Sequence, residues 1–169
     1  MIAVDTNILV YAHREESPFH AAAAECLAEL AEAPAIWAIP WPCLHEFLAV
    51  VTHPRIYAPP TPLPRALDQV DAWLEAPTLA LLAEATSYWP SLRGLLAAGR
   101  VVGPRVHDAR IAALCRDHGV RELWSADRDF TRFPVLPWLT RLCAPRLAGD
   151  PGRAVLATKS RRRGDFFLP

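Results

Sequence analysis

Acidic side chains are the residues of this sequence best suited to chemistry, and four of them stand out by position. Asp5 follows a short apolar run at the start of the chain, and Glu46 lies within a predicted helix. Asp108 begins another predicted helix, and Asp127 follows a later apolar run, with Asp129 two residues on. Carboxylates that are brought together repel one another unless a cation lies between them, and such hard oxygen ligands suit Mg²⁺ or Mn²⁺. Because a bound cation polarises a phosphodiester and lowers the pKa of its water, the set predicts metal-dependent phosphodiester hydrolysis.

Each of these carboxylates also has an ordinary structural explanation, which the sequence leaves open. Asp5 and Asp108 could serve only as helix N-caps, and Asp127 and Asp129 could be turn residues. Glu46 lies nearly opposite the apolar stripe of its helix, a position typical of a solvated side chain. Its own side of that helix carries no other charge, however. If that face is covered, Glu46 needs a partner or a metal.

Short apolar runs alternate with helical patterns along the chain, and these elements must position the acidic residues. The predicted strands are residues 2–4, 36–39, 78–81 and 120–124, with a last short strand near Leu136. The predicted helices are residues 18–33, 40–53, 63–74, 84–98 and 108–118, and an apolar helix also follows residues 5–7. This alternation predicts an α/β fold with helices on both faces of a parallel sheet. Ligands of such sheets gather beyond the carboxyl ends of the strands, where Asp5 and Asp127 are expected and where Asp108 can be brought.

Length and composition indicate one globular domain. The chain has 169 residues, of which 52% are hydrophobic and 21% charged, and its formal net charge is zero, so overall charge indicates no nucleic-acid partner. The N-terminal segment lacks the features of a signal peptide or membrane span, and we expect a cytoplasmic protein. The spacing of the four cysteines fits no paired zinc ligands, so we expect small buried side chains in a reducing compartment. The cysteines are Cys26, Cys43, Cys115 and Cys143.

The C-terminal segment differs in character from the rest of the chain. Residues 145–169 carry six basic and two acidic side chains and show no helical or strand periodicity before Phe166. We therefore predict a domain of residues 1–144 followed by a basic, flexible tail of residues 145–169. The run of three arginines at 161–163 is typical of a solvated tail, with RNA contact as the alternative.

Four segments together carry a family pattern. They are residues 1–11 (MIAVDTNILVY), 42–55 (PCLHEFLAVVTHPR), 106–115 (VHDARIAALC) and 124–134 (WSADRDFTRFP). In this order and at these intervals they resemble the motifs of PIN domains, and most of all those of the VapC toxins of bacterial toxin–antitoxin pairs. The resemblance covers roughly residues 1–142. It implies a three-layer α/β/α fold with a central parallel sheet of four or five strands.

The resemblance also implies a role for each acidic residue. Asp5, Glu46, Asp108 and Asp127 would be catalytic residues and ligands of Mg²⁺ or Mn²⁺. Asp129 is a further candidate ligand, and either or both of the last two aspartates could bind the metal. Asp127 is favoured because it comes first after the predicted strand.

The remaining implications concern supporting residues, activity and partners. Asn7 and Ser125 would orient the carboxylates. Thr is usual in the family where Ser125 stands here, but Ser keeps the hydroxyl. The activity implied is that of a metal-dependent endoribonuclease acting on tRNA, rRNA or mRNA, whose products carry a 5′-phosphate and a 3′-hydroxyl. The protein would form a homodimer, and a cognate antitoxin would insert a peptide near the site. Arg105, Arg110 or Arg128 could contact RNA phosphate.

Two other functions are weighed against this one. A catalytically silent PIN domain that only binds RNA or a protein would be expected to have lost an acidic position, and all four are present. A phosphatase of the haloacid dehalogenase type needs a second Asp two residues after the first. Asn7 occupies that position here, so this function is set aside.

Overall fold

A parallel β-sheet forms the centre of the protein in the computed structural model, which describes residues 1–127, 130 and 140–141. Five strands are hydrogen-bonded in the order β3-β2-β1-β4-β5, and every pair is parallel. The strands are β1 (Ile2–Val4), β2 (Trp37–Pro40), β3 (Leu79–Leu82), β4 (Glu122–Trp124) and β5 (Thr140–Arg141). The expected parallel sheet of four or five strands is therefore confirmed. Leu136, near which the last strand was expected, lies outside the described residues.

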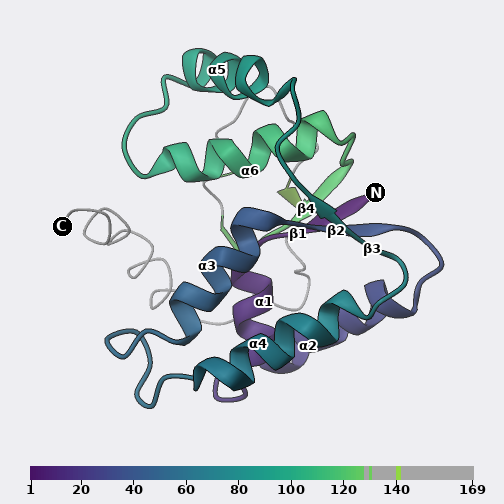
Figure 1. The fold of residues 1–169 in the computed structure, drawn as a ribbon, viewed down its shortest axis with the longest axis vertical. Coiled ribbons are helices and arrows are strands. Elements are labelled where there is room, and N and C mark those ends of the chain that lie inside the picture. The colour runs from purple at the N-terminus through teal and green to yellow at the C-terminus, as the bar shows by residue number, and fades with distance from the viewer. Residues whose placement is uncertain (128–129, 131–139, 142–169) are drawn as a thin grey trace.

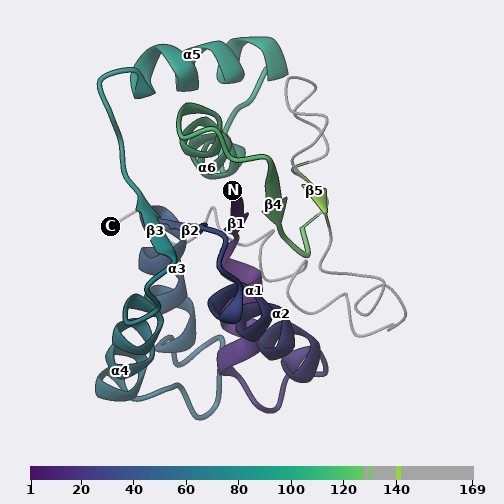
Figure 2. The same cartoon turned by 90° about the vertical axis from the view of Figure 1, so that its right-hand side faces the viewer.

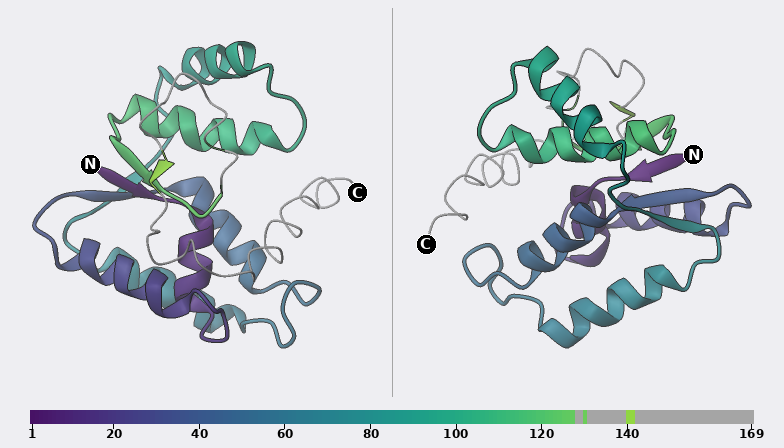
Figure 3. Two further views of the ribbon diagram at one scale, coloured as in Figure 1. Left: turned by 180° about the vertical axis from the view of Figure 1, so that it is seen from behind. Right: turned by 45° about the horizontal axis from the view of Figure 1, so that its top comes forward.

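Helices cover both faces of this sheet. They are α1 (Thr6–His13), α2 (His20–Glu32), α3 (Trp41–Val51), α4 (Leu63–Leu74), α5 (Tyr88–Gly99) and α6 (Arg105–Asp117). Figure 1 shows α5 and α6 on one side of the sheet and the first four helices on the other, and the views of Figure 3 show the same separation. The three-layer α/β/α arrangement is thus confirmed.

Proline and turn chemistry explain why some helices begin elsewhere than the periodicity predicts. The predicted helix 84–98 placed Pro90 in its interior, but α5 begins at Tyr88, so Pro90 lies in the first turn, where proline is tolerated. Helix α6 begins at Arg105, directly after Pro104. Asp108 therefore lies in the first turn of α6 and is not its N-cap, contrary to the structural explanation considered for it.

The core consists of the central strands and the helix faces that pack on them. Ala3, Val4, Ile39 and Leu123 are fully buried, as expected for strands covered on both sides. Figure 2 shows β1 and β4 side by side in the sheet, with α6 on one side of them and α1 on the other. Because all strands are parallel, their carboxyl ends share one edge, and this edge holds the polar residues described below.

Two expectations about the chain as a whole can be compared with the structure. Cys43 and Cys115 are free and buried, as expected. Cys26 is buried but disulfide-bonded, so the expectation of reduced cysteines is wrong for this residue. Among the described residues, no helix combines the length and the apolar character needed to cross a membrane.

Candidate active site

The register of the two central strands brings the first polar residues after each of them together. Val4 at the end of β1 is paired with Trp124 at the end of β4. The backbone N–H of Asp5 continues this pairing by donating to the Trp124 carbonyl at 2.9 Å. Asp5 and Ser125 are therefore neighbours at the carboxyl edge of the sheet, although 120 positions separate them in the sequence.

The Asp5 carboxylate is buried and accepts hydrogen bonds on both oxygens. Oδ1 accepts from the backbone N–H of Thr6 at 2.8 Å and from the Cys43 thiol at 3.8 Å. Oδ2 accepts from Asn7 Nδ2 at 2.7 Å and from the Ser125 hydroxyl at 2.8 Å. Asp5 is only 2% exposed, and these donors stabilise its negative charge in a place that water hardly reaches. Asp5 is the N-cap of α1 and also the centre of this polar group, so the two explanations offered for it are compatible.

Hydrogen bonds of Asn7 and Ser125 join the loop after β4 to the beginning of α1. Asn7 Nδ2 also donates to Ser125 Oγ at 3.0 Å, and Asn7 Oδ1 accepts from the backbone N–H of Ala126 at 2.9 Å. Ser125 Oγ accepts a further hydrogen bond from the backbone N–H of Asp127 at 2.9 Å. Ser125 is fully buried. Its hydroxyl therefore connects Asp5 with the backbone of Asp127.

Replacement of Ser125 tests this connection. We expect Ser125→Ala to lower the free energy of unfolding by about 1–3 kcal/mol, because buried groups of Asp5, Asn7 and Asp127 each lose a hydrogen-bond partner. Ser125→Thr keeps the hydroxyl and should lose less. Urea unfolding of the three proteins measures the difference. Equal stability of the Ala variant and the wild type would contradict the connecting role.

Glu46 is half-buried and hydrogen-bonded, and it does not point freely into solvent. Its Oε2 accepts from the hydroxyl of Thr6 at 2.8 Å. Helix α3 packs against α1, so a second side of α3 is covered besides its apolar stripe. Of the two alternatives for Glu46, the covered side chain with a partner is the one observed. Thr6 was not singled out from the sequence, although it stands between two residues that were.

The other acidic residues are placed less closely together. Asp108 is 7% exposed in the first turn of α6, and Asp127 is half-buried directly after β4. Within the part of the chain that the structure describes, no three or more Asp, Glu, His or Cys side chains form a group that could hold a metal ion. Asp129 lies outside the described residues. The structure therefore links Asp5 to Glu46 through Thr6 and to Asp127 through Ser125, but it does not draw all the carboxylates into one ligand group.

The electrostatic effects on neighbouring groups show that three of the carboxylates act on the same region. Burial raises the pKa of Tyr11 to about 12, and Tyr57, Asp127 and Asp5 add to this rise. Burial also raises the pKa of the Cys43 thiol well above its usual value, with further contributions from Asp5 and Glu46. Cys43 therefore remains a thiol at neutral pH, and a thiol is not a metal ligand. The side-chain donors left in this region are carboxylate oxygens, whose chemical type suits Mg²⁺ or Mn²⁺, although the described carboxylates are not gathered into one ligand group.

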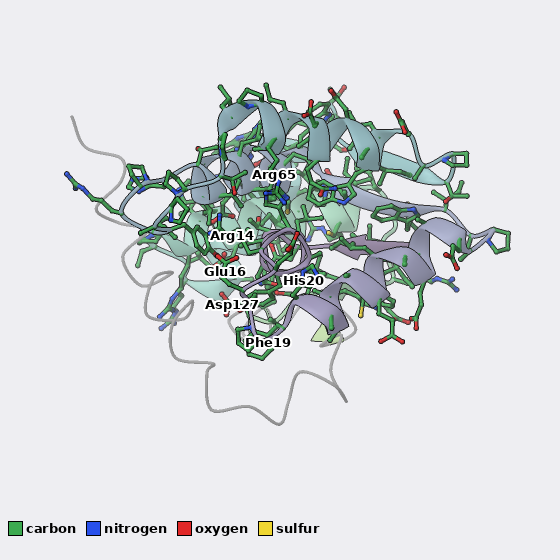
Figure 4. All side chains as sticks on the ribbon, turned by 90° about the horizontal axis from the view of Figure 1, so that it is seen from below. Arg14, Glu16, Phe19, His20, Arg65 and Asp127 are labelled. Atoms are coloured by element: carbon green, nitrogen blue, oxygen red, sulfur yellow. The ribbon has the colours of Figure 1, made fainter. Side chains whose placement is uncertain are left out.

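A second polar group surrounds Arg14, which follows α1 at the end opposite to Asp5. Arg14 forms an ion pair with Glu16, donates to Thr61 Oγ1 at 2.9 Å and lies 4.1 Å from the centre of the Tyr57 ring. Beside it is a cavity of about 400 Å³, whose polar lining is His13, Glu15, His20, Arg65, Asp68 and Gln69. Figure 4 labels Arg14, Glu16, His20 and Arg65 around α1, and Asp127 is labelled close to Glu16 in the same view. None of the candidate site carboxylates lines this cavity, so it is separate from the site.

The three arginines considered for RNA contact have different surroundings. Arg110 donates two hydrogen bonds to Glu84, at 2.7 and 3.0 Å, so its guanidinium is already paired. Arg105 is exposed at the beginning of α6. Arg128 lies outside the described residues. Arg105 is thus the better placed of the two described arginines.

Comparison with known proteins agrees with the fold and with the sequence motifs. Residues 2–136 match the PIN-domain family, and this match covers most of the chain. The chain therefore belongs to the PIN-domain family.

Its relatives place it with the VapC-type proteins of that family. The chain is 33% identical over 129 residues to Ribonuclease VapC48 of Mycobacterium tuberculosis, an alignment that covers 76% of this chain and 89% of the relative. It is 36% identical over 138 residues to the VapC ribonuclease Mb2897 of Mycobacterium bovis, with 82% and 93% covered. The resemblance inferred from the four sequence segments is confirmed.

Two solved structures share the fold at lower sequence identity. The first is VapC20 of Mycobacterium tuberculosis, described as a sarcin–ricin loop cleaving toxin, with a TM-score of 0.58, 16% identity and coverage of 78% of this chain and 93% of that one. The second is VapBC2 from Rickettsia felis bound to a DNA fragment from its promoter, with a TM-score of 0.57, 22% identity and coverage of 80% and 96%. At these identities the two structures support the three-layer fold alone.

Proposed function

We propose that this protein is a Mg²⁺-dependent endoribonuclease and the toxin component of a toxin–antitoxin pair. The observation that carries the proposal is the buried Asp5 carboxylate at the carboxyl edge of the sheet, linked to Glu46 by Thr6 and to Asp127 by Ser125. The family match and the relatives named as ribonucleases support the same activity.

In this proposal Asp5, Glu46, Asp108 and Asp127 hold the cation and are the catalytic residues, with Asp129 as a further candidate ligand. When bound, Mg²⁺ or Mn²⁺ supplies a water of lowered pKa and polarises the phosphodiester. The chain's own contribution is to hold the carboxylates in place. Asp5 cannot rotate without breaking bonds to donors on α1, α3 and the loop after β4. A fixed carboxylate loses little conformational freedom on binding a cation, which favours binding.

The proposed partners are RNA, a cognate antitoxin protein and a second copy of the chain, in the cytoplasm. The candidate RNA substrates remain tRNA, rRNA and mRNA, and one of the solved structures is described as a sarcin–ricin loop cleaving toxin. The VapBC2 complex supports an antitoxin partner. Residues 1–144 would form the nuclease domain and residues 145–169 a basic tail.

Cleavage of RNA by the purified protein tests the activity directly. We expect total RNA or one member of a tRNA panel to be cut with Mg²⁺ or Mn²⁺ and to remain intact with EDTA, since the carboxylates act through a cation. The products should carry a 5′-phosphate, which makes them substrates for a 5′-phosphate-dependent exonuclease. Cleavage that persists in EDTA would contradict metal dependence.

The catalytically silent PIN domain is the alternative. Absence of cleavage with every metal, in a sample shown to be folded and free of antitoxin, would favour that function. Retention of RNA on the same sample in a filter-binding assay would then distinguish an RNA-binding module from a protein-binding one.

A further inference from the structure

Thr6 contacts both of the candidate metal ligands that the structure links most directly. Its backbone N–H donates to Asp5 Oδ1 at 2.8 Å, and its hydroxyl donates to Glu46 Oε2 at 2.8 Å. Both distances are those of well-formed hydrogen bonds to a charged acceptor. A single residue at the first position of α1 therefore connects a carboxylate at the end of β1 with one on α3.

Helix α3 makes a second contact with the same pair of residues. Cys43 and Glu46 are three residues apart, so they lie on the same side of α3. The Cys43 thiol donates to the same Asp5 oxygen that binds the Thr6 backbone. Two hydrogen bonds therefore join α3 to Asp5 and Thr6, and the Thr6–Glu46 bond is the shorter of them.

The hydroxyl of Thr6 is shielded from water. Thr6 is 3% exposed, and Cys43 beside it is fully buried. A hydrogen bond in such surroundings is stronger than one in water. Loss of the Thr6 hydroxyl would therefore remove one of the contacts that orient the Glu46 carboxylate.

We infer that Thr6 is a positioning residue, which holds Glu46 at a fixed place relative to Asp5 before a cation binds. The inference deepens the proposed function, on which its metal-binding consequence rests. Residues that hydrogen-bond to metal-ligating carboxylates set the orientation of the ligands, and their removal typically lowers metal affinity by about 10- to 100-fold. Because Thr6 is 3% exposed, its role would be exercised through the two carboxylates and not through the substrate or the cation.

Titration of the metal-free protein with Mn²⁺ by calorimetry tests the consequence. Thr6→Val keeps the shape of the side chain but not its hydroxyl. We expect this change to raise the dissociation constant for Mn²⁺ about tenfold or more. Thr6→Ser restores the hydroxyl and should bind within about twofold of the wild type. Thr52→Val is the matched control, because Thr52 donates its hydroxyl to the Leu48 carbonyl at the far end of the same helix, and its loss should leave Mn²⁺ affinity unchanged.

A double-mutant cycle without metal tests the link itself. In the metal-free protein, the fall in melting temperature of the double variant Thr6→Val plus Glu46→Met should be smaller than the sum of the falls in the two single variants. Methionine cannot accept from the Thr6 hydroxyl, so each single change already removes the same bond. Strictly additive losses, or a Thr6→Val variant that binds Mn²⁺ as the wild type does, would overturn the inference. If the wild-type protein binds no Mn²⁺, both the metal-dependent function and the role of Thr6 toward a cation are overturned. If the losses in the cycle are additive, only the role of Thr6 is overturned.

Discussion

The Asp5→Asn variant is expected to cut RNA at least about a hundredfold more slowly than the wild type. This magnitude is a lower bound, since even the partners of metal ligands change metal affinity by about 10- to 100-fold. The physical reason lies in the donors around Asp5. The new amide nitrogen replaces one of the two carboxylate oxygens and therefore faces two donors in either orientation. At the position of Oδ1 the donors are the Thr6 N–H and the Cys43 thiol. At the position of Oδ2 they are Asn7 Nδ2 and the Ser125 hydroxyl.

The donors that lose their acceptor in Asp5→Asn also predict a loss of stability, which the experiment must separate from the loss of activity. Two unsatisfied donors in a buried place lower the free energy of unfolding by about 1–3 kcal/mol. RNA cleavage is therefore measured at a temperature at which circular dichroism shows both proteins folded. Addition of Mn²⁺ should raise the melting temperature of the wild type and not that of the variant. Asp71→Asn, an identical change at an exposed position of α4, should retain full cleavage. Wild-type cleavage by the Asp5→Asn protein would remove Asp5 from the mechanism.

Phe47→Ala is expected to cause the largest loss of stability among the changes considered. Phe47 is fully buried on α3, and its ring lies 4.8 Å from that of Trp73 on α4 and 5.2 Å from that of His13 on α1, both nearly edge to face. Removal of such a ring costs about 3–5 kcal/mol, out of about 5–15 kcal/mol for a typical domain. Because Phe47 joins three helices and follows Glu46 directly, its loss should also loosen the contact of Glu46 with Thr6.

Urea unfolding measures this effect, with Phe47→Leu as the control. Leucine keeps most of the apolar volume, so the control should lose about 1 kcal/mol. A Phe47→Ala variant that loses no more than the Leu variant would show that the three helices are held together elsewhere.

Much of the fold could be predicted because local patterns determine it. The apolar run of residues 2–4 and the periodicity of residues 63–74 predict β1 and α4 with the bounds observed. Parallel pairing then follows from the alternation of strands and helices, and it correctly brings the residue after β1 to the same edge as the residues after β4. Pro90 shows where periodicity alone fails, since its backbone restriction decides where α5 begins.

The candidate site could be predicted only in part because its contacts join distant segments. The position of Glu46 opposite the apolar stripe of α3 favoured a solvated side chain and left a covered one open. A helical pattern does not show that α1 packs against α3. The Thr6–Glu46 bond spans 40 positions and the Ser125–Asp5 bond spans 120, so no local signal indicates either. The family motifs identified Asn7 and Ser125 as supporting residues, but they did not show that Ser125 connects Asp5 to the backbone of Asp127.

The distance in sequence between Asp5 and Ser125 also has a consequence for the cell that synthesises the protein. Strand β1 lies between β2 and β4, and β4 is made only after residue 121. At a translation rate of about 5–20 residues per second, roughly 6 to 24 s pass between the synthesis of Asp5 and that of Ser125. During this time β4 and Ser125, which help to bury Asp5, have not been made, and the Asp5 carboxylate remains hydrated. Under the proposed function, an unfinished chain cannot assemble the site, and the RNAs that take part in its own translation are not exposed to it until most of the domain has been made.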